Sequence, residues 1–189
     1  MGRKKRSSDV EIEFEPDEPA ELIQIYGRID KDLSAVICEK VSQIASSGGE
    51  VVLLINSPGG DWFDTMAIIA SIEEAKQVTS VTTKVLGLAA SGAALIAASG
   101  TRGKRYAFLH SWYLLHKPFM EFGEGEVMTS KSLQTELNVL RDLGGQMSEI
   151  LSKYTGKPKQ WIETKLDQDG DIWVPAREAK EWGLVDVIF

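Results

Sequence analysis

The chain has 189 residues, of which 43% are hydrophobic and 26% are charged, a composition typical of a soluble globular protein. Its length suits one domain with a sizeable core, or one domain with a small appendage. The 21 basic and 28 acidic residues give a formal net charge of −7, which argues against a general nucleic-acid binder.

The cysteine, histidine and hydropathy patterns further narrow the class of protein and its cellular compartment. Cys38 is the only cysteine, so an internal disulfide is excluded and a reducing compartment such as the cytoplasm is favoured. The two histidines have no neighbouring cluster of metal-ligand type, so we expect no metal site. The sequence has no apolar run long enough to span a bilayer, and basic residues 3–6 are not followed by the apolar stretch of a signal peptide. We therefore expect a cytoplasmic protein that binds neither nucleic acid nor membrane.

The N-terminal part of the chain differs in pattern from the rest. Residues 1–9 are basic and then polar, which predicts a disordered tail. Apolar and acidic side chains alternate over residues 10–15, and this period of two predicts a strand. A proline-rich turn could return that strand against residues 22–26 as a hairpin, and an acidic solvated arm is the alternative. We accordingly separate a tail, residues 1–20, from a domain over residues 21–189.

Within the domain, strand patterns alternate with helix patterns. Predicted strands cover residues 50–60, 81–86 and 184–189, with a further strand leading towards His116. Predicted helices cover residues 33–47, 62–72, 126–154 and 175–182, and another begins at Ser91. This alternation predicts an α/β layered fold with right-handed crossovers. The long helix carries one leucine-rich stripe, from Leu133 to Leu151, which either joins the core or packs against another subunit.

One polar side chain lies in the middle of a small-residue stretch, "GLAASGAALIAASG", residues 87–100. In one interpretation Ser91 caps the first turn of a buried helix. In the other, Ser91 is a nucleophile on a strand-to-helix turn, where the small neighbours leave room for a substrate carbonyl. The turn "INSPGG", residues 55–60, follows the preceding buried strand and offers exposed backbone amides. Both turns lie at carboxyl ends of predicted strands, where open α/β sheets place their sites.

Four ordered segments resemble the Clp protease proteolytic subunit family, serine peptidases of crotonase-like fold. The segments are "INSPGG", "GLAASGAALIAASG", "GKRYAFLHSWYLLHKP" and "TGKP…DIWVPAREAKEWGLVD". The resemblance runs from about Leu22 to Phe189. It implies repeated β-β-α layers with a protruding handle helix.

The resemblance also implies a set of catalytic residues. Ser91 would be the nucleophile and His116, before Lys117-Pro118, the general base. The N–H groups of Gly60 and Gly92 would form the oxyanion hole, and Asp171 would complete the triad.

The acid of the implied triad has competitors in the same loop. Counting forward from Thr155 leads to Asp169, and counting backward from "PAREAKEWGLVD" leads to Asp171. We prefer Asp171 because "DIWVPA" follows the family's order of residue types. Asp167 ranks third, and a solvated acidic turn is the alternative for all three.

The resemblance also bears on the substrate-binding segment, on the second histidine and on the residue after the nucleophile. The segment with Gly123, Glu124 and Gly125 matches the family's strand that pairs with extended peptide. The second histidine, His110, is interpreted as structural. Gly92 departs from the family, which usually has Met after the nucleophile. A glycine there is costlier to hold in one conformation, so we expect a looser oxyanion hole and a slower enzyme.

The function implied by the resemblance is a self-compartmentalised, ATP-dependent serine endopeptidase subunit that cleaves unfolded polypeptide through an acyl-enzyme. Its homo-oligomer would be two stacked heptameric rings fed by an AAA+ unfoldase, so ATP would be the partner's cofactor and this chain would need none. The strand within residues 1–20 would then be axial in the ring, although it does not resemble the family's usual axial segment. The alternatives are a catalytically silent structural ring subunit and an acyl-CoA-binding crotonase-fold enzyme, which would suit Ser91 as a helix cap.

Overall fold

The computed structural model describes residues 21–120, 127–168 and 170–189. These form an α/β fold around one sheet, with strand order β1-β2-β3-β4-β7 and with β5 and β6 attached beside β3. The strands are β1 (Leu22–Ile29), β2 (Val51–Gly60), β3 (Val81–Ala90), β4 (Arg105–Ala107), β5 (Trp112–Leu115), β6 (Ile172–Pro175) and β7 (Val187–Ile188). The helices are α1 (Lys31–Ser46), α2 (Trp62–Ala75), α3 (Gly92–Ser99), α4 (Ser130–Thr155), α5 (Lys159–Gln168) and α6 (Ala176–Trp182).

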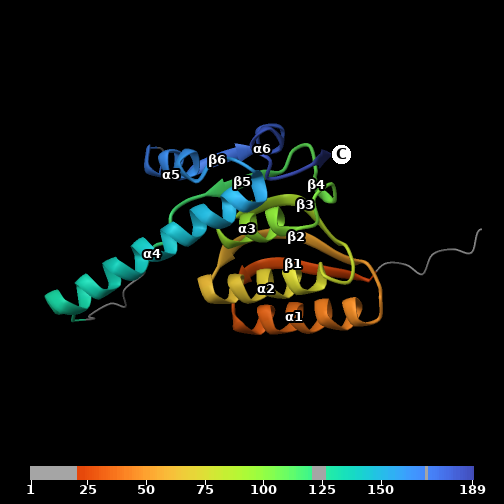
Figure 1. The fold of residues 1–189 in the computed structure, drawn as a ribbon, viewed down its shortest axis with the longest axis horizontal. Helices are drawn as coiled ribbons and strands as arrows, with labels where there is room; N and C mark the ends of the chain where they lie inside the picture. The colour runs from red at the N-terminus through yellow and green to blue at the C-terminus, as the bar shows by residue number, and fades with distance from the viewer. Residues whose placement is uncertain (1–20, 121–126, 169) are drawn as a thin grey trace, which may run out of the picture.

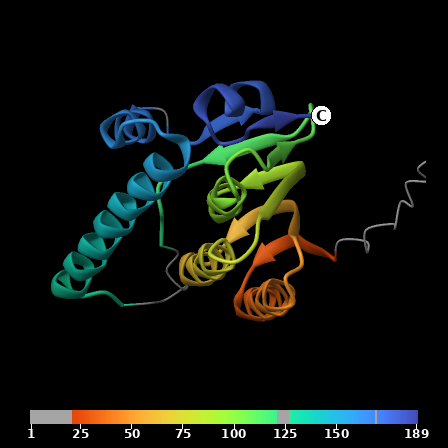
Figure 2. The same cartoon turned by 45° about the vertical axis from the view of Figure 1, so that its right-hand side comes forward.

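The strand pairs of this sheet are parallel except for β5 with β6. Figures 1 and 2 show α1, α2 and α3 along the β1–β3 part of the sheet, as expected when helices connect parallel strands. Because parallel strands point the same way, β2 and β3 end side by side, with Ser57 of β2 opposite Ala89 of β3. The two glycine-containing segments singled out in the sequence therefore meet at one end of the sheet.

Helix α3 explains the small-residue stretch on either side of Ser91. All eight of its residues are buried, against β2, β3, α2 and α4. A helix enclosed on every side must carry apolar side chains all round, and alanine and glycine let its neighbours approach closely. The stretch is thus a central element of the core, in addition to any role of Ser91.

Helix α4 projects from the rest of the fold (Figures 1 and 2). It begins at Ser130, later than the predicted residue 126, because Thr129 and Ser132 form a capping box. Its predicted leucine stripe divides into two parts. Leu151 is fully buried in the core, whereas Leu133 and Leu137 are 44% and 47% exposed on the projecting half.

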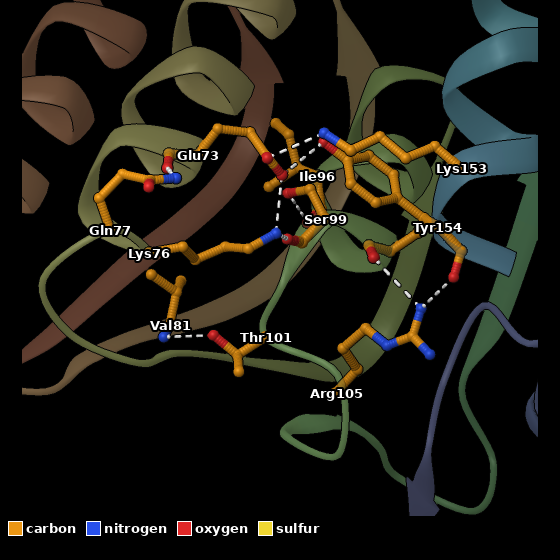
Figure 3. Close-up of polar contacts among 11 residues, drawn as sticks. Glu73, Lys76, Gln77, Val81, Ile96, Ser99, Thr101, Arg105, Lys153 and Tyr154 are labelled. Carbon is orange, nitrogen blue, oxygen red and sulfur yellow. Dashed lines mark hydrogen bonds and ion pairs between the residues drawn. The ribbon is translucent and has the colours of Figure 1, made fainter.

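Four polar side chains join the base of α4 to α2 (Figure 3). Glu73 of α2 accepts hydrogen bonds from Lys76 at 2.7 Å, Lys153 at 2.8 Å and the Tyr154 hydroxyl at 2.9 Å. Lys76 also donates to the carbonyl of Ser99 at the end of α3, at 3.0 Å. The Glu73–Lys76 ion pair therefore connects three helices of the core, α2, α3 and α4.

A second ion pair anchors the C-terminal part of the chain. The guanidinium of Arg105 forms two hydrogen bonds with the carboxylate of Asp186, at 2.8 and 2.5 Å, and a third with the carbonyl of Tyr154 at 2.9 Å. The Arg105 side chain is only 5% exposed. This geometry is the bidentate arrangement that makes arginine suitable for buried carboxylates.

Three elements were not predicted from the sequence, the short strand β4 among them, and one prediction lies outside the described residues. The other two are helix α5 and strand β6. Helix α5 carries only two buried apolar side chains, Ile162 and Leu166, which is too weak a stripe to stand out. The strand predicted over residues 10–15 cannot be compared with the structure.

Candidate active site

Ser91 lies at the turn between β3 and α3 in an unusual backbone conformation. Its φ of 53° and ψ of −124° make it the one non-glycine residue with positive φ in the described part of the chain. Its N–H donates to the carbonyl of Leu114 at 2.8 Å, and its own carbonyl accepts from Ala94 at 3.0 Å. Such a conformation costs an L-residue about 1–3 kcal/mol and is found mostly at functional sites. A strained strand-to-helix turn of this kind is how several hydrolases expose a serine nucleophile.

The cap interpretation of Ser91 is wrong. Ser91 occupies the N-cap position of α3, but its side chain makes no capping hydrogen bond. The hydroxyl of a capping serine would accept from an N–H of the first helical turn.

The "INSPGG" segment, predicted as a turn, is the last part of strand β2, and its Gly59 packs directly against Ser91. The buried hydroxyl of Ser57 donates to the carbonyl of Gly27 at 2.6 Å and accepts from the N–H of Gly59 at 3.0 Å, which fixes the segment. Gly59 has a φ of +86°, and a Cβ there would lie 2.5 Å from the carbonyl oxygen of Ala90 and 2.7 Å from the Cβ of Ser91. Only glycine fits this position, because both its backbone conformation and its neighbours exclude a side chain.

Four of the predicted residues surround one cavity of about 430 Å³. Ser91, Gly60, Gly92 and His116 all line it. Much of the remaining lining is apolar, including the side chains of Trp62, Phe63, Leu95, Phe119, Leu143 and Met147. The cavity therefore combines a hydroxyl, an imidazole and backbone amides with room for an apolar group.

His116 follows β5 and its hydrogen bond defines its tautomer. Nδ1 lies 2.8 Å from the carbonyl oxygen of Lys117, and the ring packs against Phe119 with centroids 5.4 Å apart. Since a carbonyl oxygen can only accept, Nδ1 must carry the proton. Nε2 of the neutral ring is then unprotonated and able to accept a proton, as a general base requires.

Asp171 and His116 line a common cavity, of about 450 Å³, that is distinct from the Ser91 cavity. His116 is thus a lining residue of both the Ser91 cavity and the Asp171 cavity. Among the described residues, however, no hydrogen bond joins Ser91, His116 and Asp171 in this conformation.

The other acidic candidates and the second histidine are placed differently. Asp167 forms an ion pair with the side chain of Lys117, the residue after His116. Asp169 lies outside the described residues, as do Gly123, Glu124 and Gly125. His110 is exposed and packs edge-on to Phe108, with centroids 5.6 Å apart, and it lines neither cavity.

Sequence reasoning missed one residue of the site, Thr65 of α2. Its side chain is fully buried and lines the Ser91 cavity beside Gly92. Its hydroxyl donates to the carbonyl of Asp61 at 2.7 Å. A threonine one turn into an amphipathic helix gives no sequence signal for such a position.

Two negative findings apply to the described residues. No group of three or more His, Cys, Asp or Glu side chains there is arranged to hold a metal ion. None of the helices found in that part of the chain is both long and apolar enough to cross a membrane.

Comparison with known proteins agrees with this fold. The family model described as Clp protease matches residues 18–189. The chain is 36% identical over 140 residues to the ATP-dependent Clp protease proteolytic subunit 2 of Corynebacterium jeikeium (strain K411), a match that covers 74% of this chain and 64% of the relative. It is 34% identical to the subunit 2 of Tropheryma whipplei (strain Twist), with 88% and 89% covered, and 32% identical to the subunit 3 of Rhodococcus jostii (strain RHA1), with 87% and 78% covered.

The architecture and these matches show that the chain is an α/β protein with the ClpP-like fold. The chain belongs to the Clp protease family. The predicted fold class is thereby confirmed, and family membership supports a ClpP-like peptidase. The match spans less than two thirds of the Corynebacterium protein.

Proposed function

We propose that this chain is a serine endopeptidase subunit that cleaves unfolded polypeptide through an acyl-enzyme. One observation carries the proposal: Ser91, held at a φ of 53° on a strand-to-helix turn, shares a cavity with His116, Gly60 and Gly92. Nucleophile, base and backbone donors are the groups that acyl transfer requires in one place.

The reaction follows from the roles of these groups. His116 Nε2 takes the proton of the Ser91 hydroxyl while Oγ attacks the scissile carbonyl carbon. The oxyanion of the tetrahedral intermediate accepts hydrogen bonds from the N–H groups of Gly60 and Gly92. His116 then gives the proton to the leaving amine, which leaves an acyl ester on Ser91. A water molecule that His116 deprotonates then attacks the ester carbonyl and releases Ser91.

Asp171 is the proposed orienting carboxylate. In the present conformation Nδ1–H donates to the carbonyl of Lys117. A ring rotation towards the cavity shared with Asp171 would replace this neutral acceptor by a carboxylate, which stabilises the imidazolium formed during catalysis.

The proposed assembly is two stacked heptameric rings in the cytoplasm, with a Clp ATPase as the unfolding partner. The names of the relatives include "ATP-dependent" and "proteolytic subunit", which supports a proteolytic complex. Exposed Leu133 and Leu137 on the projecting half of α4 offer an apolar surface for ring-to-ring contact. ATP would be used by the partner, and extended substrate would pair with the segment around Gly123, Glu124 and Gly125.

Covalent labelling with a fluorophosphonate, mapped by mass spectrometry, tests the proposal. We expect the label on Ser91, and no label on Ser91→Ala. His116→Ala should reduce labelling at least about 100-fold, since a general base contributes about 10²–10⁴ in rate. His110→Ala is the matched control, because this exposed histidine lies outside both cavities and its loss should leave labelling unchanged.

A catalytically silent ring subunit is the second candidate. It is favoured by the hydrogen bond that holds Nδ1 of His116 on the Lys117 carbonyl and by the lack of a Ser91–His116 hydrogen bond among the described residues. An assembled protein that resists the fluorophosphonate, while it still forms rings, would support the silent subunit. The acyl-CoA-binding alternative loses its main argument, because Ser91 does not cap α3.

A further inference from the structure

Thr65 is held rigidly at the start of α2. Asp61 caps this helix by accepting hydrogen bonds from the N–H groups of Phe63 and Asp64, at 2.8 and 3.0 Å. The carbonyl of Asp61 also accepts from both the N–H and the hydroxyl of Thr65, at 3.0 and 2.7 Å. The Thr65 side chain is fully buried, so it has a single orientation next to the chain segment that follows Gly60.

The Thr65 side chain occupies the space where a side chain at position 92 would lie. A Cβ built on Gly92 would lie 2.2 Å from Thr65 Oγ1, 3.0 Å from Cγ2 and 3.1 Å from Cβ. Gly92 is not among the glycines with positive φ, so its backbone would accept any L-residue. The contact with Thr65, and not the backbone conformation, therefore requires glycine at position 92.

We infer that Thr65 is a positioning residue that holds the Gly92 amide in the proposed oxyanion hole. The inference rests on the proposed function. Gly60 directly precedes Asp61, Asp61 holds Thr65 by two hydrogen bonds, and Thr65 packs against Gly92. The two proposed donor N–H groups are thereby connected through one buried side chain. In this inference Thr65 compensates for glycine after the nucleophile, which opposes the looser oxyanion hole expected from the sequence.

Steady-state peptidase kinetics on a set of variants test this inference. Gly92→Ala should lower kcat about 100-fold with little change in KM, because the displaced amide acts mainly in the transition state. Adding Thr65→Ala removes both Oγ1 and Cγ2, and the double variant should have a kcat at least about tenfold higher than Gly92→Ala alone. Adding Thr65→Val instead keeps a methyl group in the place of Oγ1, and should restore nothing. Thr65→Ser alone keeps the hydroxyl and should stay within about twofold of the parent.

Thermal unfolding of the same variants separates this inference from the proposed function. Gly92→Ala should lower Tm by about 3–9 °C, and Thr65→Ala should recover part of this loss only in the Gly92→Ala background. Additive Tm changes, or equal kcat for the Ala and Val double variants, would overturn the positioning role while Ser91 labelling still supports the peptidase. A parent that resists the fluorophosphonate would overturn the proposed function, and with it the catalytic meaning of the Thr65–Gly92 contact, even if the Tm changes are coupled.

Discussion

Replacing Glu73 by glutamine should weaken the attachment of α4 to α2 by a predictable amount. Burial alone would raise the pKa of Glu73, but hydrogen bonds from Lys153, Lys76 and Tyr154 outweigh it and lower the pKa from 4.5 to about 2. Without solvent screening, this shift would correspond to between about 3 and 4 kcal/mol of folding free energy. The Glu73 side chain is 30% exposed, and solvent screening reduces the figure to about 1–2 kcal/mol.

The pH dependence of this stabilisation has a definite sign. Because the folded-state pKa lies below the ordinary value, the stabilisation is complete above about pH 4.5 and is lost as the pH falls towards 2. Urea unfolding of the parent and Glu73→Gln should therefore differ by about 1–2 kcal/mol at pH 7 and at pH 5.5, and by less at pH 3.5. Glu74→Gln is the control, since Glu74 is adjacent and exposed. A difference that stays constant down to pH 3.5, or an equal effect of Glu74→Gln, would refute the reasoning.

Three further predictions concern the carboxylates and one glycine. Asp171→Asn should lower kcat by about 10⁴-fold, as loss of an orienting carboxylate does elsewhere, whereas Asp167→Asn should change kcat little. If steady-state kinetics show the large loss for Asp169→Asn instead, Asp169 is the acid of the triad. Asp186→Asn should cost about 3–5 kcal/mol in urea unfolding, because it leaves the buried guanidinium of Arg105 without its charged partner. Gly59→Ala should abolish fluorophosphonate labelling, since its Cβ would displace the Ser91 turn, and normal labelling would contradict this geometry.

The order of the main helices and strands could be predicted because their signals are local. The buried strand β2 begins with a continuous apolar run, and helices α1, α2 and α4 carry apolar residues at helical spacing. Helix α5 and strand β6 carry weak local patterns, and long-range contacts define them. Strand β6 forms only by pairing with β5, in the register Leu114 with Trp173. No sequence period encodes a partner that lies about 60 residues away.

The parts of the candidate site that depend on neighbouring residues in the sequence could be predicted, and those that depend on distant contacts could not. Ser91 stands out because small residues surround its hydroxyl on both sides, and "INSPGG" stands out because two glycines follow its proline. The acid stays a prediction, because Asp167, Asp169 and Asp171 lie within five residues of one another and sequence alone does not choose among them. Thr65 could not be found from the sequence, since its role consists entirely of a contact with Gly92 across two helices.

The three glycines around Ser91 are required by three different neighbours, which shows how the site is built. Gly59 is required by the carbonyl of Ala90 and by Ser91 itself, Gly60 by the backbone of Ile29 in β1, and Gly92 by Thr65 in α2. At Gly60 a Cβ would lie 2.0 Å from the carbonyl oxygen of Ile29, within the β1–β2 pairing. The Ser91 turn is therefore fixed by the packing of β1, β2 and α2 before any substrate is present. A substitution in any of these three elements should act on the nucleophile through backbone position, even where its side chain never contacts the peptide.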